Sequence, residues 1–184
     1  MVMSKKVFKL NPLSSSSITA LQKQLREYRD SLDKKCERFV RELAESGISV
    51  AKVNTGNFGK YLAFTVQSSR TADGYKAVLL ATNTGIIHSE WRTKDGVKTA
   101  DVSPLLMCEF GSGLRAKNPM NVPGVGTGTF PGGTHGTDPE GWWYMDLDGV
   151  WHHSYGMTPK MPMYHASLAI MSNIQRVAKE VFGT

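Results

Sequence analysis

The five histidines are the residues whose chemistry first suggests a site, because imidazole ligates metals and exchanges protons near neutral pH. His152 and His153 are adjacent in a β-forming run, so we expect their side chains on opposite faces of a strand. The other three, His88, His135 and His165, are widely separated, and no pair has the spacing of a zinc site. A metal-dependent hydrolase using His152, His153 and an aspartate stays open as a hypothesis. The pattern favours structural histidines, and we predict no bound metal.

The two cysteines and the glycine-rich runs give no stronger indication of catalysis. Cys36 falls on the apolar stripe of a predicted helix, and Cys108 has no histidine near it in the sequence that could activate its thiol. Two isolated cysteines are typical of a protein made in a reducing cytoplasm. The runs 56–60 and 124–128 lack the spacing and flanking elements of phosphate-binding or dinucleotide-binding loops. We therefore predict no catalytic residue and no cofactor.

Length, composition and charge limit the class of protein. The chain has 184 residues, a length typical of one domain, with 22 basic and 16 acidic side chains. It contains neither an apolar run of membrane-spanning length nor the apolar segment of a secretory signal, so we expect no membrane partner. Residues 1–50 carry a net charge of +4 and residues 101–150 a net charge of −4. This asymmetry suits a protein whose copies meet through differently charged surfaces.

Two amphipathic helices are predicted, one towards each end of the chain. Over residues 17–46, apolar side chains recur at steps of three and four and form one stripe, and Gly47 follows as a potential cap. At ~1.5 Å per residue this helix would be about 45 Å long, so it must lie across a sheet, a partner or both. The second helix is predicted over 162–182. Residues 1–16, with three lysines between apolar residues, are interpreted as a flexible basic arm.

Between the helices the pattern changes to β-strands and a long loop. Residues 48–113 contain four β-rich runs separated by turn residues, and short connections of this kind favour antiparallel pairing. The runs are 48–53, 60–67, 75–82 and 85–91, and a short helix or turn is predicted at 101–110. Residues 114–141 are rich in glycine and proline and have no apolar period, which predicts a projecting loop.

Residues 142–155 predict an aromatic β-hairpin around an Asp148-Gly149 turn. A two-residue turn would place one set of aromatic side chains on a common face: Trp142, Tyr144, Trp151 and Tyr155. The opposite face would carry Trp143, Met145, Leu147 and Val150. Because both faces are apolar, each must be covered by the core, by another subunit or by a stacked ligand. The chain is thus predicted to be one α+β domain, in which an antiparallel sheet carries both helices and a Gly/Pro-rich loop projects.

The order of short motifs in the second half of the chain resembles that of the tail-completion, or head–tail joining, proteins of long-tailed bacteriophages. The run 108–113, Cys-Glu-Phe-Gly-Ser-Gly, is similar to that family's Glu-aromatic-Gly-Thr-Gly motif. A Gly/Pro-rich loop, the run 141–144 (Gly-Trp-Trp-Tyr), an Asp-Gly turn and the Trp151 strand follow in the family's order. The run 161–166 and the long first helix also look like the family's. Ser112 stands where threonine is usual, and Cys108 where an aliphatic or aromatic residue is.

The resemblance implies a virion structural protein and not an enzyme: a neck component, made in the host cytoplasm, that joins the tail to the DNA-filled head. It implies a ring, six copies by analogy with neck components, between connector and tail-tube proteins, with passive DNA contact in the channel. The alternative within the class is a tail terminator or another minor tail or capsid component. The alternative from another class is a glycan- or nucleic-acid-binding module that uses the aromatic hairpin.

The residues expected to contact neighbouring subunits or partners come from the motif, the hairpin and the start of the last helix. They are Glu109, Phe110, Gly111, Gly113, Trp142, Tyr144, Trp151, Tyr155, Met163 and Tyr164. Each type of residue also has a structural interpretation. Glu109 could anchor the glycine turn through backbone hydrogen bonds, and the aromatic side chains could belong to the core of one chain.

Overall fold

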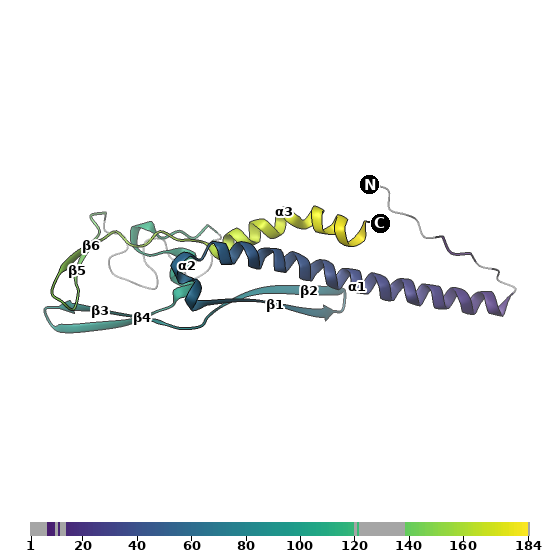
Figure 1. Ribbon diagram of the computed structural model, residues 1–184, viewed down its shortest axis with the longest axis horizontal. Helices are drawn as coiled ribbons and strands as arrows, with labels where there is room; N and C mark the ends of the chain where they lie inside the picture. Colours follow the sequence, from purple (N-terminus) through teal and green to yellow (C-terminus); the bar gives the residue numbers. More distant parts are fainter. Residues whose placement is uncertain (1–6, 10, 12–13, 120, 122–138, 184) are drawn as a thin grey trace.

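The long N-terminal pattern, the β-rich runs and the C-terminal pattern fold into an elongated α+β molecule (Figure 1). The structure is a computed structural model, and it describes residues 7–9, 11, 14–119, 121 and 139–183. The predicted fold class is confirmed, because the molecule combines a long N-terminal helix, antiparallel strands and a C-terminal helix. Most of the predicted loop 114–141 and much of the predicted arm 1–16 lie outside the described residues.

The first helix, α1, spans Ser15–Val53 and continues past its predicted end. The Ser14 side chain caps its first turn by accepting a hydrogen bond from the backbone N–H of Ser17. The prediction of a strand at 48–53 was wrong, because Gly47 does not end the helix. It is buried where α1 approaches α3 and β2: a Cβ there would lie 2.8 Å from Ile170 and 3.1 Å from Leu79. Gly47 therefore serves close packing between elements.

The last helix, α3, spans Pro162–Phe182 as predicted and packs along the C-terminal half of α1. Their contact forms the hydrophobic core, in which Leu43 of α1 lies against Val177 and Val181 of α3. The rings of Phe39 and Phe182 extend this contact, with centroids 5.5 Å apart. Burying one side chain of this size contributes about 1.5–3 kcal/mol. The α1–α3 pair is therefore the stable base on which the other elements are positioned.

The first sheet is a two-stranded hairpin that packs against α1. A 3-10 turn at Gly56–Tyr61 leads from α1 into β1, Leu62–Thr71, which pairs antiparallel with β2, Gly74–Asn83. Near the turn of this hairpin, Arg70 forms an ion pair with Asp33 of α1 at 2.9 Å. The hairpin thus covers α1 up to about that point, and Figure 1 shows the first turns of α1 continuing beyond it.

The second sheet is separate from the first, so the prediction of one sheet was wrong in this respect. It has the strand order β4-β3-β5-β6 and lies at the end of the molecule opposite the N-terminus of α1 (Figure 1). Its strands are β3 (Ile87–Thr93), β4 (Gly96–Val102), β5 (Trp142–Met145) and β6 (Trp151–Ser154). The predicted helix or turn at 101–110 is β4's last residues followed by α2, Pro104–Phe110. A 3-10 turn, Gly113–Arg115, follows α2.

Candidate functional site

The carboxylate of Glu109, in the last turn of α2, caps the start of α3. Its Oε2 accepts a hydrogen bond from Met163 N at 2.8 Å, and its Oε1 accepts one from Tyr164 N at 2.9 Å. Met161, at the N-cap position of α3, has a φ of 53° and makes no side-chain capping bond. The exposed amides and the dipole of a helix N-terminus favour an anion in this position. Glu109 therefore ties the start of α3 to the end of α2.

Burial changes the proton affinity of two neighbouring groups here. It raises the pKa of the Glu109 carboxyl, while the two backbone hydrogen bonds and His165 act in the opposite direction. It also raises the pKa of the Cys108 thiol to about 11, and Glu109 adds to that effect. The thiol lies 3.7 Å from the carbonyl oxygen of Thr55. Because a protonated thiol is a poor nucleophile, Cys108 joins α2 to the end of α1 and is not activated for catalysis.

The glycines of the motif allow α2 to lie directly against the segment before α3. Ser112 N donates to Met157 O at 2.9 Å, and Met157 N donates to Ser112 O at 3.1 Å. Gly111 and Gly113 have φ values of 72° and 59°, where side chains are strained. A Cβ on Gly113 would also lie 2.6 Å from the Trp142 ring, and one on Gly111 would overlap the Met157 carbonyl. Both positions require glycine for conformation and for space.

We call this meeting point of residues 108–113, 156–157, 161–164 and Trp142 the motif junction. Seven of the predicted interface residues belong to it and are buried or half-buried: Glu109, Phe110, Gly111, Gly113, Trp142, Met163 and Tyr164. Their contacts within one chain account for the spacing of the motif. The other three predicted residues, Tyr144, Trp151 and Tyr155, are on the surface.

The aromatic hairpin has a different register from the predicted one. Trp151 lies opposite Met145, and His153 lies opposite Trp143. The predicted register, with a two-residue Asp148-Gly149 turn, was wrong by one residue. Because side chains alternate between faces, a shift of one residue moves every side chain of one strand to the other face of the sheet. The four aromatic residues predicted to share a face are therefore divided between two faces.

The side chain of Asp146 accounts for the longer turn. The loop contains three residues, 147–149, and is closed by a hydrogen bond from Asp146 N to Val150 O at 3.0 Å. Asp146 Oδ1 accepts from Val150 N at 2.9 Å, and Oδ2 lies 2.7 Å from His152 Nε2. The hydrogen bond with His152 lowers the pKa of the Asp146 carboxyl. Gly149, with a φ of 84°, completes a three-residue turn of the bulged type.

One face of the second sheet presents an aromatic surface that we call the aromatic face. It consists of Trp143, Met145, Trp151 and His153, which the observed register places together, and of Tyr155, whose ring contacts that of His153. The side chains of Trp143 and Trp151 are 63% and 59% exposed. The His153 ring lies between those of Trp143 and Tyr155, with centroids 4.6 Å away in each case. Sequence reasoning missed Trp143 as a candidate because it assigned that residue to the wrong face.

The two adjacent histidines have separate partners within the chain. His152 bonds Asp146 and stacks on Tyr144, with ring centroids 5.2 Å apart, whereas His153 Nε2 lies 2.7 Å from the carbonyl oxygen of Glu140. They therefore do not converge on one ion. In the part of the chain that the structure describes, no three His, Cys, Asp or Glu side chains gather closely enough to hold a metal ion. No helix there combines the length and apolarity needed to cross a membrane.

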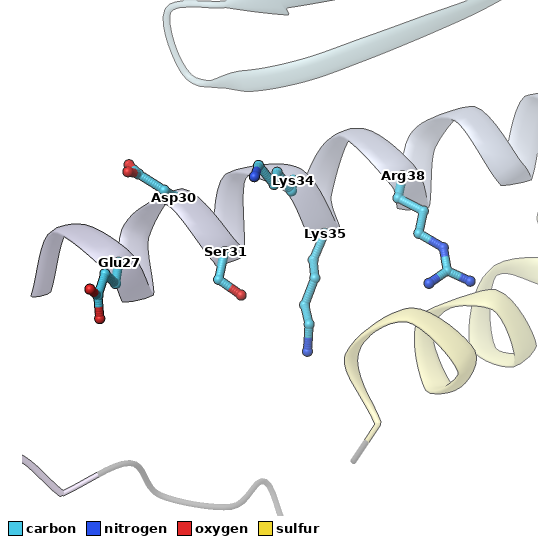
Figure 2. A pocket seen from close by; sticks show the side chains of 6 residues that line it. All are labelled: Glu27, Asp30, Ser31, Lys34, Lys35 and Arg38. Atoms are coloured by element: carbon cyan, nitrogen blue, oxygen red, sulfur yellow. The ribbon is translucent and has the colours of Figure 1, made fainter. Parts of the chain in front are cut away.

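A surface hollow lies along the polar side of α1, and its lining comes entirely from that helix. Figure 2 shows the side chains fanning outwards instead of converging: Glu27, Asp30, Ser31, Lys34, Lys35 and Arg38. Two acidic residues line one end of the hollow and three basic residues the other, so the hollow has no single charge to attract a ligand.

The described residues thus form an internal joint at the motif junction and an exposed aromatic surface at the aromatic face. Comparison of the chain with known protein families, with curated proteins and with solved structures finds no match.

Proposed function

We propose that this chain is a structural protein of the virion of a long-tailed phage: a neck or tail-completion component that joins the tail to the DNA-filled head as one copy of a ring. The motif junction carries the proposal. The segments in which the sequence resembles the tail-completion family are far apart in the chain, yet they meet there. Glu109 bonds the start of α3, Ser112 bonds Met157, and Gly113 lies under Trp142. A likeness spread over segments that form one joint favours a shared fold.

The surface of the chain supports a role in assembly. Soluble monomers rarely leave large contiguous apolar patches in water, and such patches mark sites of association. The aromatic face exposes Trp143, Trp151 and Tyr155 on one side of an otherwise thin sheet. Trp151 is mostly exposed among the described residues, which supports a contact with a partner over a place in the core of one chain.

In this proposal the protein acts by binding and needs neither a catalytic residue nor a cofactor. Its partners are further copies of itself, six by analogy with neck components, and the adjoining connector and tail-tube proteins. It is made in the host cytoplasm, becomes part of the neck or tail region of the virion, and contacts DNA passively where the ring surrounds the channel.

A second candidate function is favoured by the observed register of the hairpin. Trp143 and Trp151 lie on the same exposed face, an arrangement on which sugar rings or bases can stack. A glycan- or nucleic-acid-binding module would show quenching of tryptophan fluorescence on titration with oligosaccharides or single-stranded oligonucleotides. Unchanged fluorescence with both would remove this candidate.

The test of the proposed function is a nonsense codon in this gene in its parent phage, followed by negative-stain electron microscopy of the lysate. We expect separate DNA-filled heads and complete tails, and joining restored by a plasmid-borne copy of the gene. Tails of abnormal length would instead identify a tail terminator. Intact, joined particles made without the protein would overturn the structural role.

A further inference from the structure

The first turns of α1 extend beyond the described helices and strands that pack on the rest of α1, and among the described residues the Phe8 ring contacts Tyr28 there. Figure 1 shows α1 continuing past the end of α3 and past the turn between β1 and β2. We call residues 15–32 the projecting end; at ~1.5 Å per residue it is about 27 Å long. Its apolar stripe includes Ile18, Leu25 and Leu32, which are 39–45% exposed. Further along α1 the same stripe packs against α3, so the apolar side chains of the projecting end are of the kind that pack against another element.

The aromatic face is the complementary case: a sheet surface that the described helices leave open. Trp143 and Trp151 are exposed on it, and Tyr155 beside them is 43% exposed. A stable layer arises when the apolar face of a sheet packs against the apolar stripe of a helix. The β1–β2 hairpin already forms such a layer with the C-terminal half of α1. Among the described elements, the projecting end therefore has no sheet packed against it, and the aromatic face has no helix packed against it.

Charge favours pairing these two surfaces over pairing either with itself. Residues 139–159, which contain β5, β6 and their turn, include Glu140, Asp146 and Asp148 and no lysine or arginine. Arg92 of β3 lies opposite Met145 on the aromatic face, where Glu90, two residues before it, offsets its charge. The projecting end has three basic and two acidic side chains, a net charge of +1, and Lys9 lies close by because its neighbour Phe8 contacts Tyr28. Two projecting ends would bring like charges together, as would two hairpins. Opposite charges across an interface favour the correct partner and its register.

The positions of the two surfaces show which molecule can supply the helix that binds the aromatic face. They lie at opposite ends of the elongated molecule (Figure 1), so one chain cannot bring them together. We propose that the aromatic face binds the projecting end of α1 of a second copy of this chain. Because each copy has both surfaces, the contact is head-to-tail and closes into a ring when the rotation between copies permits it. This inference rests on the proposed function only in that a ring supplies adjacent copies.

Disulfide cross-linking of the purified full chain tests this contact. Two variants, Leu25→Cys and Tyr155→Cys, are each made with Cys36→Ser; Cys108 is retained because it is buried. Both engineered positions are exposed, so the fold tolerates the changes. We expect a cross-linked dimer after oxidation when the two proteins are mixed, and none from either protein alone. Adding Trp143→Ala to the Tyr155→Cys protein should lower the yield roughly tenfold, since buried tryptophans dominate interface energies.

The matched control is Leu168→Cys on the outer side of α3, which is 42% exposed, and it should give no cross-link with Tyr155→Cys. A cross-link from Leu25→Cys alone would show helix-to-helix pairing and overturn the inference. So would a cross-link between positions 168 and 155, or no cross-link in any mixture. Because these assays use purified protein, a negative result together with separated heads and tails in the nonsense-codon lysate would reject the contact and leave the proposed function standing.

Discussion

Replacing Glu109 by alanine should destabilise the chain by about 2–4 kcal/mol, because the acceptor of two backbone amides is lost. The carboxylate accepts hydrogen bonds from Met163 N and Tyr164 N and is 8% exposed. Without it, both amides of the first turn of α3 lack their acceptor, and the volume it filled is empty. A buried donor left without an acceptor costs about 1–3 kcal/mol, and partial access of water places this site in the lower half of that range.

The Glu109→Gln variant separates the hydrogen bonds from the charge. Its single amide oxygen can accept one of the two bonds, while its NH₂ group faces the other donor. It also loses the attraction to the helix dipole, which contributes up to ~2 kcal/mol in partly buried sites. Since an ionised carboxylate bears a desolvation cost that the amide avoids, the net loss is smaller than for alanine. We expect about 1–2 kcal/mol.

The sign of the pH dependence follows from the raised pKa of Glu109. The folded state binds this proton more tightly than the unfolded state does. Stability from Glu109 therefore increases as the pH falls from neutral towards the ordinary carboxyl value of 4.5, and it decreases as the pH rises through the folded-state pKa. The Glu109→Gln variant cannot take up this proton and gains no stability as the pH falls. The difference in free energy of unfolding between the wild type and this variant should therefore be larger at pH 5 than at pH 7.

Urea unfolding followed by far-ultraviolet circular dichroism at pH 7 and pH 5 measures these effects. The control is Glu180→Ala near the end of α3, where the carboxylate pairs with Arg176 at 2.9 Å and is half-exposed. An exposed pair of this kind contributes about 0.5 kcal/mol or less. If Glu109→Ala loses no more stability than this control, Glu109 does not hold α3 in place. If the stability difference between Glu109→Gln and the wild type is smaller at pH 5 than at pH 7, burial is not the dominant influence on the pKa of Glu109.

The remaining predictions concern the hairpin, the motif glycines and the buried thiol. Trp151→Ala should lower the free energy of unfolding by less than about 1 kcal/mol, whereas Trp142→Ala, in the motif junction, should lower it by about 2–4 kcal/mol. Equal losses of stability in urea unfolding would contradict the faces assigned to these two side chains. Gly113→Ala should cost about 2–4 kcal/mol, but Gly149→Ala, which has a similar backbone conformation in open space, only about 1 kcal/mol. A thiol reagent at pH 8 should label the other cysteine first and Cys108 only upon unfolding, because burial protects it; rapid labelling of both in the folded protein would refute this.

The helices were predictable from the sequence because their stabilising pattern is local. The apolar stripe recurs at helical spacing, and α3 has the predicted bounds. The error at 48–53 came from a residue whose role depends on distant elements. Gly47 looks like a cap in the sequence, yet it is the point of closest approach to Ile170 and Leu79. Tertiary packing overrode the β-propensity of the following residues.

The site was harder to predict, because its geometry depends on long-range contacts and on one turn. The sequence identified Glu109 but could not show that its bonding partners lie more than fifty residues further along the chain. It also identified the hairpin, but the Asp-Gly signal favoured a two-residue turn. The side chain of Asp146 stabilises a three-residue turn instead. That difference exchanged the faces of β6 and concealed Trp143 as a surface residue.

The central claim, a place at the junction of head and tail, is tested most directly by locating the protein in assembled virions. Purified particles of the parent phage would be labelled with gold-conjugated antibody against this chain and imaged by electron microscopy. We predict gold at a single position, where the tail meets the head. Gold along the tail or over the capsid, or particles that contain none of the protein, would contradict the proposed function.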